Sequence, residues 1–111
     1  MKSVLAVAVT VVAVAILLAG EPAPDFAIDW HVVQSRIQLR WPAVRSLTYD
    51  PADDFVTIVV TDSTTSAQAG AASCVTVLPT MLYAGSRALF AVYTESGAII
   101  SSWNRCLAPP T

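Results

Sequence analysis

The sequence predicts a small α+β fold, a two-layer sandwich in which a four-stranded antiparallel sheet carries two helices on one face. Three observations support this class. Apolar residues recur at helical spacing in two segments, each segment is followed by a pair of short β-rich runs, and each pair is joined by residues typical of a tight turn. The resulting α-β-β-α-β-β order is preceded by an N-terminal apolar segment, which we also expect to be helical.

The first helix of the domain is predicted from apolar residues spaced four, three, four and four apart, namely Phe26, Trp30, Val33, Ile37 and Trp41. Polar and charged residues lie between them, which makes this helix amphipathic. Asp25 stands just before the stripe and is the candidate N-cap. Pro42 disfavours helical backbone at the residue before it, so it marks the end of the helix.

The second helix is predicted within residues 64–85. Thr65 and Gln68 fit a capping box at its start. Helical spacing places its inward stripe at Ala67, Ala71, Cys74, Val75, Leu78 and Leu82. Pro79 should end or kink this helix, and Gly85 is suited to close its last turn.

Two hairpins supply the four predicted strands. In the first, two β-rich runs flank the sequence DPADD, where Asp50 and Pro51 suit the first two positions of a type I turn. Alternation in its second run places Val56, Ile58 and Val60 on one face and Phe55, Thr57 and Val59 on the other. The runs ALFAVYT and AIISSW form the second hairpin, and Gly97 between them suits the positive φ of a three-residue loop.

Residues 1–20 have the charge pattern of an export segment. Lys2 precedes an apolar run over Val4–Gly20 that contains no charged residue, and Glu21 follows it. This pattern places the N-terminus in the cytoplasm and the rest of the chain outside. The run is close to the lower limit of about 17 residues for a membrane-spanning helix. A cut after Gly20 would put Leu18 where signal peptidase prefers a small residue, so we expect a retained signal anchor, with a cleaved signal peptide as the alternative.

These features divide the chain into four parts. They are a signal anchor or signal peptide (1–20), a short Pro-containing spacer (21–25), a single extracytoplasmic α+β domain (26–106) and a tail (107–111). We expect the domain on the outer side of the cytoplasmic membrane, or secreted if the leader is cleaved. The abundance of Ala, Val and Arg beside a single Lys is typical of a GC-rich bacterial genome.

The exported part contains both cysteines of the chain, Cys74 and Cys106. Oxidising compartments favour disulfides, and so small a domain benefits from one. We therefore expect a disulfide that pins the second helix to the end of the last strand, with a stabilisation of about 3–4 kcal/mol in the chain-entropy model. The two cysteines do not form a C-x-x-C motif, which disfavours a redox role.

Residue types that carry catalysis are sparse in this sequence. The single histidine, His31, lies two residues after Asp29 on the first helix, a spacing at which the carboxylate cannot readily orient the ring. The three aspartates of DPADD lack the spacing of a calcium loop, and Ser86 lies in no nucleophile motif. The sequence therefore indicates no catalytic, metal or cofactor site, and a hydrolase is the least favoured function.

The chain is expected to act by binding another protein. Four aromatic residues fall on the predicted strands, Tyr49, Phe55, Tyr93 and Trp103, and an uncovered sheet face would present some of them as a partner surface. Ordinary cross-strand packing is the competing interpretation. A net charge of −2 without a basic cluster argues against nucleic acid.

We therefore predict a non-enzymatic exported accessory protein, anchored in the membrane, that binds a protein partner at the cell envelope. The alternative function is that of a small secreted effector, such as an inhibitor or a phage-encoded exclusion factor. The two functions differ in the fate of residues 1–20, because a secreted effector requires that the leader be cleaved.

Overall fold

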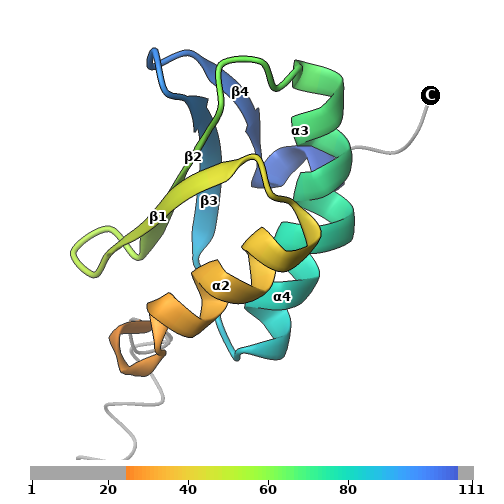
Figure 1. Cartoon of the computed structure of the whole chain (residues 1–111). Coiled ribbons are helices and arrows are strands. Elements are labelled where there is room, and N and C mark those ends of the chain that lie inside the picture. The colour runs from red at the N-terminus through yellow and green to blue at the C-terminus, as the bar shows by residue number, and fades with distance from the viewer. Residues whose placement is uncertain (1–24, 108–111) are drawn as a thin grey trace, which may run out of the picture.

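The described part of the chain, residues 25–107 of the computed structural model, alternates two helical segments with two strand pairs (Figure 1). The α+β class, the four strands and the two helical segments predicted from the sequence are confirmed. The predicted leader over residues 1–20, spacer residues 21–24 and tail residues 108–111 lie outside the described residues. Within residues 25–107, no helix combines the length and the apolar character needed to cross a membrane.

The sheet is mixed, and the prediction of an entirely antiparallel sheet is wrong. Its strands β1 (Val44–Asp50), β2 (Phe55–Val60), β3 (Leu89–Thr94) and β4 (Ile99–Ser102) lie side by side in chain order. Both hairpins are antiparallel as expected, but the central strands β2 and β3 pair in parallel. The helical segment between them returns the chain to the end of the sheet where β2 began, and a strand that starts there must run parallel to β2.

Both helical segments cover the same face of this sheet (Figure 1). The first, α2 (Trp30–Arg40), contributes Val33 and Ile37 to a single buried cluster. The strands contribute the residues of one alternation to it, namely Val44, Leu47, Val56, Ile58, Val60, Phe90 and Val92. The opposite sheet face has no helix over it among the described residues, so the fold is the expected two-layer sandwich.

Asp29, and not the predicted Asp25, caps helix α2. The Asp29 carboxylate accepts the backbone N–H groups of His31 and Val32, while Asp25 begins a separate 3-10 turn, Asp25–Ala27. The helix starts later than predicted because Asp25 has partners elsewhere in the fold, which are described below. Its C-terminal end at Arg40, just before Trp41 and Pro42, agrees with the restriction that proline imposes on the preceding residue.

The crossover between β2 and β3 is one continuous helical segment with a wide turn in the middle. It consists of α3 (Ser66–Ala72), a π-helical turn (Ser73–Val77) and α4 (Leu78–Tyr83), and it starts with the predicted Thr65–Gln68 capping box. Proline cannot donate a backbone hydrogen bond, and its ring crowds the carbonyl four residues earlier. The π turn relieves this conflict before Pro79, since the N–H of Leu78 bonds to the carbonyl of Ser73. The helix therefore continues past the proline to Tyr83.

Most of the inward stripe predicted for this crossover is wrong, although Leu78 does pack against the core. The residues buried against the sheet are Ala69, Ser73, Thr76, Val77 and Met81. A π turn contains one residue more than an α turn, so the residues after it are rotated relative to a regular helix. The sequence pattern also did not predict that two polar residues, Ser73 and Thr76, would be buried against the sheet. Val75 and Leu82 are exposed to solvent, and so are Ala67 and Ala71 before the π turn, so the displacement of the stripe begins ahead of that turn.

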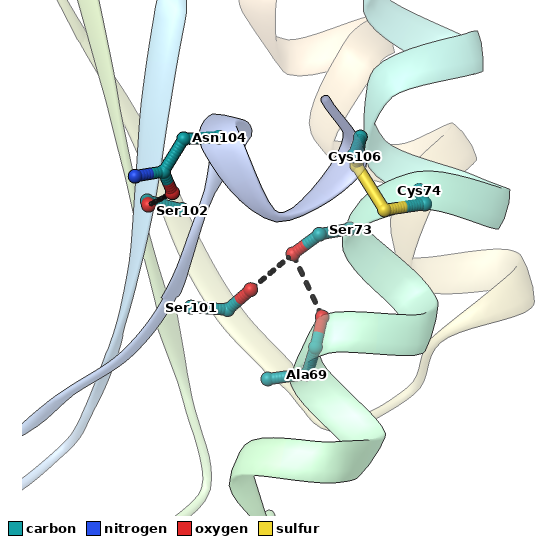
Figure 2. Close-up of a disulfide and its surroundings, with 7 residues drawn as sticks. All are labelled: Ala69, Ser73, Cys74, Ser101, Ser102, Asn104 and Cys106. Atoms are coloured by element: carbon teal, nitrogen blue, oxygen red, sulfur yellow. Dashed lines mark hydrogen bonds between the residues drawn. A yellow bond between two sulfur atoms is a disulfide. The ribbon is translucent and has the colours of Figure 1, made fainter. Parts of the chain in front are cut away.

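The predicted disulfide between Cys74 and Cys106 is confirmed (Figure 2). Cys74 lies in the π turn, and Cys106 ends a 3-10 turn, Trp103–Cys106, that follows β4. Their α-carbons are 5.1 Å apart. Beside the disulfide, the buried Ser73 hydroxyl donates to the carbonyl of Ala69 (2.7 Å), so the contact at 2.9 Å with Ser101 must use the Ser101 proton. These bonds explain how two serines are accommodated between the helix and the sheet.

We expect Cys106→Ser to lower the free energy of unfolding by about 3–4 kcal/mol, because the bond closes a loop with a sequence separation of 32 residues. Urea unfolding of the full-length protein in mild detergent, followed by circular dichroism, measures this loss. The double variant Cys74→Ser/Cys106→Ser is the control, and it should be no less stable than the single variant, since both lack the same bond. A loss below about 1 kcal/mol would show that the disulfide is not a main source of stability.

Candidate functional site

The four aromatic residues predicted to form a partner surface do not share one surface. Phe55 and Tyr93 lie on the uncovered sheet face, at opposite ends of the β2–β3 pair. Tyr49 lies on the helix-covered face, because it pairs with the fully buried Val56, and its ring stacks on Trp30 with centroids 4.7 Å apart.

The fourth predicted aromatic, Trp103, is not on a strand. It begins the 3-10 turn after β4, and its side chain packs against the buried core. On the uncovered face, Phe55 and Tyr93 are accompanied by the more exposed Leu89 and Ile99. Of the four predicted residues, only Phe55 and Tyr93 therefore lie on the uncovered sheet face.

A polar cluster joins the start of the domain to the loop before β3. One carboxylate oxygen of Asp25 accepts three hydrogen bonds, from the hydroxyl of Ser86 (2.5 Å) and from the backbone N–H groups of Arg87 (3.0 Å) and Ala88 (3.1 Å). Ser86 is buried, and its hydroxyl proton is committed to Asp25. The serine therefore acts as a link between two chain segments, 61 residues apart, and has no free proton to give up as a nucleophile.

Tyr49 and Asp54 extend this cluster to the β1–β2 turn. The Tyr49 hydroxyl donates to the Asp54 carboxylate (2.5 Å) and accepts the backbone N–H of Asp25 (2.7 Å). Burial of the phenol raises the pKa of Tyr49 to about 12, and the hydrogen bond to Asp54 is the second-largest cause of this increase. Asp54 has a positive φ of 48°, an uncommon conformation that its short polar side chain tolerates. We call Asp25, Tyr49, Asp54 and Ser86 the Asp25 cluster.

The remaining candidates for chemistry are dispersed. His31 is exposed on the first turn of α2, and Asp29 binds its backbone N–H and not its ring. Asp50 accepts the N–H of Ala52 within the turn, as its type I turn position predicts. Among residues 25–107, no three His, Cys, Asp or Glu side chains lie close enough together to hold a metal ion.

The outer side of the helix layer contains a groove between α2 and α4. Its walls are Arg36, Leu39 and Arg40 from α2 and Pro79, Thr80 and Tyr83 from α4, and its volume is about 400 Å³. We call these six residues the outer groove. The two helices pack against each other, so the groove lies above their contact. Leu39 and Tyr83 are 83% and 84% exposed, which is unusual for two large side chains in one small site.

Both arginines of the outer groove lack an ion-pair partner in the described part of the chain. The guanidinium of Arg36 lies over the Tyr83 ring, 5.8 Å from its centroid. The one ion pair within residues 25–107 joins Arg45 to Glu95, on a different part of the surface. The groove therefore combines apolar walls with two positive charges that no described carboxylate neutralises.

A second, more open hollow of about 640 Å³ lies next to the outer groove. It lies between the loop before β1, the loop after β2 and the first half of the crossover, and it is lined by Trp41, Pro42, Ala43, Thr61, Ser63, Thr64, Gln68, Ala71, Ala72, Val75 and Thr76. Trp41 follows Arg40 in the chain, and Thr76 is one helical turn before Thr80, so the two hollows lie end to end. The helix layer thus has an extended concave surface that sequence patterns alone did not indicate, although Leu39 lay outside the predicted stripe and was a signal of it.

Asp25→Ala should destabilise the fold more than Asp29→Ala does. The first change removes an acceptor shared by three donors, one of them on a buried serine, and should cost about 2–3 kcal/mol, although the Ala88 N–H keeps the Ser86 oxygen as a second acceptor. The second removes a helix N-cap and should cost about 1 kcal/mol. Chemical unfolding of both full-length variants tests the order, and the opposite ranking would show that Asp25 is not the main link at this end of the domain.

The stability of the protein should depend on the Tyr49 proton at alkaline pH. The pKa of Tyr49 rises from 10.0 to about 12 in the fold, so the folded state holds the proton more tightly than the unfolded state. This contribution is complete below pH 10 and is lost as the pH rises towards 12. The free energy of unfolding should fall more steeply across this range for the wild type than for Tyr49→Phe. Tyr93→Phe retains Tyr49 and should behave like the wild type, whereas parallel curves for wild type and Tyr49→Phe would contradict the assignment.

The two sites described above differ in what they leave free. The polar atoms of the Asp25 cluster bind one another, so the cluster is suited to holding chain segments together. The outer groove leaves apolar surface and two guanidinium groups without partners among the described residues, so it is suited to binding another molecule.

Comparison with known proteins found no family model, no curated protein and no solved structure that matches this chain.

Proposed function

We propose that this chain is a non-enzymatic exported interaction protein. Its apolar segment Val4–Gly20 holds it at the cytoplasmic membrane, and its folded domain binds a protein partner at the cell envelope. The observation that carries the proposal is the amount of apolar surface on the outer side of the helix layer. Leu39, Val75 and Tyr83, which line the two hollows, are between 71% and 84% exposed there.

Exposed apolar side chains that gather on one face of a small domain are typical of a binding surface. Burying these side chains lowers the free energy by about 25 cal/mol for each Å² of apolar area removed from water, which favours association. The uncovered sheet face is a weaker candidate, since Phe55 and Tyr93 are already half-buried there. We therefore place the partner on the helix layer, which differs from the sheet face expected from the sequence.

The non-enzymatic part of the proposal is supported by the residues around the two hollows. Neither hollow is lined by an acid, a histidine or a cysteine, the side chains that most often transfer protons or attack substrates. The carboxylates of the Asp25 cluster lie elsewhere and are occupied by internal hydrogen bonds. A binding role uses the groups that the helix layer offers, and a catalytic role would need groups that the hollows do not supply.

The alternative of a small secreted effector is compatible with the same domain and the same disulfide. It differs in the leader, because a free effector needs cleavage of residues 1–20. The intact mass of the protein purified from its native compartment separates the two. A mass that includes Met1–Gly20 supports the membrane-held form, and a mass that begins at or after Glu21 supports the effector.

Purification from native membranes in mild detergent tests the proposed function. We expect a partner protein at a stoichiometric level with the wild type and its loss from Leu39→Glu/Tyr83→Glu, because two charges on apolar walls resist burial. Leu89→Glu/Ile99→Glu, on the uncovered sheet face, is the matched control and should retain the partner. Recovery of the wild type as a monomer without a stoichiometric partner would contradict the proposal.

A further inference from the structure

The outer groove also has a charge pattern that narrows the chemistry of its occupant. Arg36 and Arg40 lie four residues apart on α2, so they stand one helical turn from each other on the same side. Both line the groove together with the apolar Leu39 and Pro79. The whole chain has a net charge of −2, so this positive site differs in sign from the protein as a whole.

Tyr83 prepares one of these arginines for binding. The Arg36 guanidinium lies 5.8 Å from the centroid of the Tyr83 ring, within the range of a cation–π contact, and such a contact leaves its N–H donors available. Such donors match the two oxygens of a carboxylate, and the geometry is often bidentate. Because this contact favours one position of the Arg36 side chain before any partner arrives, less conformational entropy is lost when a carboxylate binds.

The groove also excludes two other classes of anionic partner on physical grounds. Nucleic acid is recognised by a basic surface that follows several phosphates, and two arginines beside apolar walls do not form one. A lipid surface is flat on the scale of one domain, whereas these residues enclose a concave volume of about 400 Å³. A protruding side chain fills such a volume better than a bilayer surface does.

We propose that the outer groove binds an amphipathic segment of another protein, in which a large apolar side chain enters the groove and neighbouring carboxylates pair with Arg36 and Arg40. In a helical segment, two acidic residues one turn apart match the spacing of the two arginines. The inference rests on the proposed function, because it names the chemistry of the partner segment.

Selection from a random-peptide phage library on the full-length protein, held in phosphatidylcholine nanodiscs, tests this chemistry. We expect the enriched peptides to carry at least two acidic residues next to a large apolar residue. Synthetic copies should bind Arg36→Gln/Arg40→Gln about tenfold more weakly than the wild type at low salt. Wild-type binding should weaken as the salt concentration rises, so the difference between the two proteins should shrink.

Arg45→Gln/Arg87→Gln is the matched control, since it removes the same charge from two exposed arginines outside the groove. It should change peptide affinity by less than about twofold. The proposal is overturned if no peptide is enriched, if the enriched peptides are neutral or basic, or if both double variants lose affinity equally.

Nanodiscs that contain phosphatidylglycerol test the lipid alternative. A polarity-sensitive dye attached after Leu39→Cys should report the same environment in these discs as in phosphatidylcholine discs. The contrary result is a dye signal that shifts towards an apolar environment in phosphatidylglycerol discs, and does so only when Arg36 and Arg40 are present. That result would assign the surface to lipid and overturn the proposal. Failure here is distinct from failure of the proposed function, because a native partner that stays bound to Arg36→Gln/Arg40→Gln would retain the function and remove only the acidic-segment inference.

Discussion

Most of this structure depends on which side of the crossover helix, residues 66–83, faces the sheet. Cys74 lies in the π turn at the middle of the crossover, and its disulfide to Cys106 attaches that turn to the end of the sheet. The buried Ser73 and Ser101 hydroxyls bond to each other next to it. A covalent bond and a satisfied polar contact at one place leave the helix little freedom to turn, so they determine which side chains face the sheet.

The same rotation determines what the helix shows to solvent. With Val77 and Met81 directed to the core, Val75, Leu82 and Tyr83 are left on the outside. A regular helix with the predicted stripe would have buried Val75, which lines the second hollow, and the exposed apolar surface there would be smaller. The π turn before Pro79 therefore shapes the surface that we propose for partner binding, and such turns are frequent at functional sites. The Asp25 cluster acts on the other wall of the outer groove, because it attaches the chain just before α2 to the loop that follows α4.

Much of the fold could be predicted because its local signals agree with one another. The capping box at Thr65, the positive φ of Gly97 and the alternation around Val56 each specify a structure within a few residues. The features that were missed depend on distant partners. Asp25 had the expected sequence position of an N-cap, but its carboxylate binds Ser86, which is 61 residues away, and no local pattern records that. The parallel pairing of β2 and β3 followed from the crossover length, a topological signal that the two clear hairpins obscured.

The groove was hidden from the sequence for a related physical reason. Amphipathic patterns identify the side of a helix that enters the core, and they treat an apolar residue on the other side as unremarkable. Leu39 and Tyr83 become significant only when α2 and α4 pack and bring them together beside Arg36. Side chains from two helices held on one sheet change their relative positions little, so the groove exists before a partner arrives. Association then costs less ordering entropy than it would on two mobile loops. This pre-formed geometry supports the proposal that a specific partner binds to the helix layer.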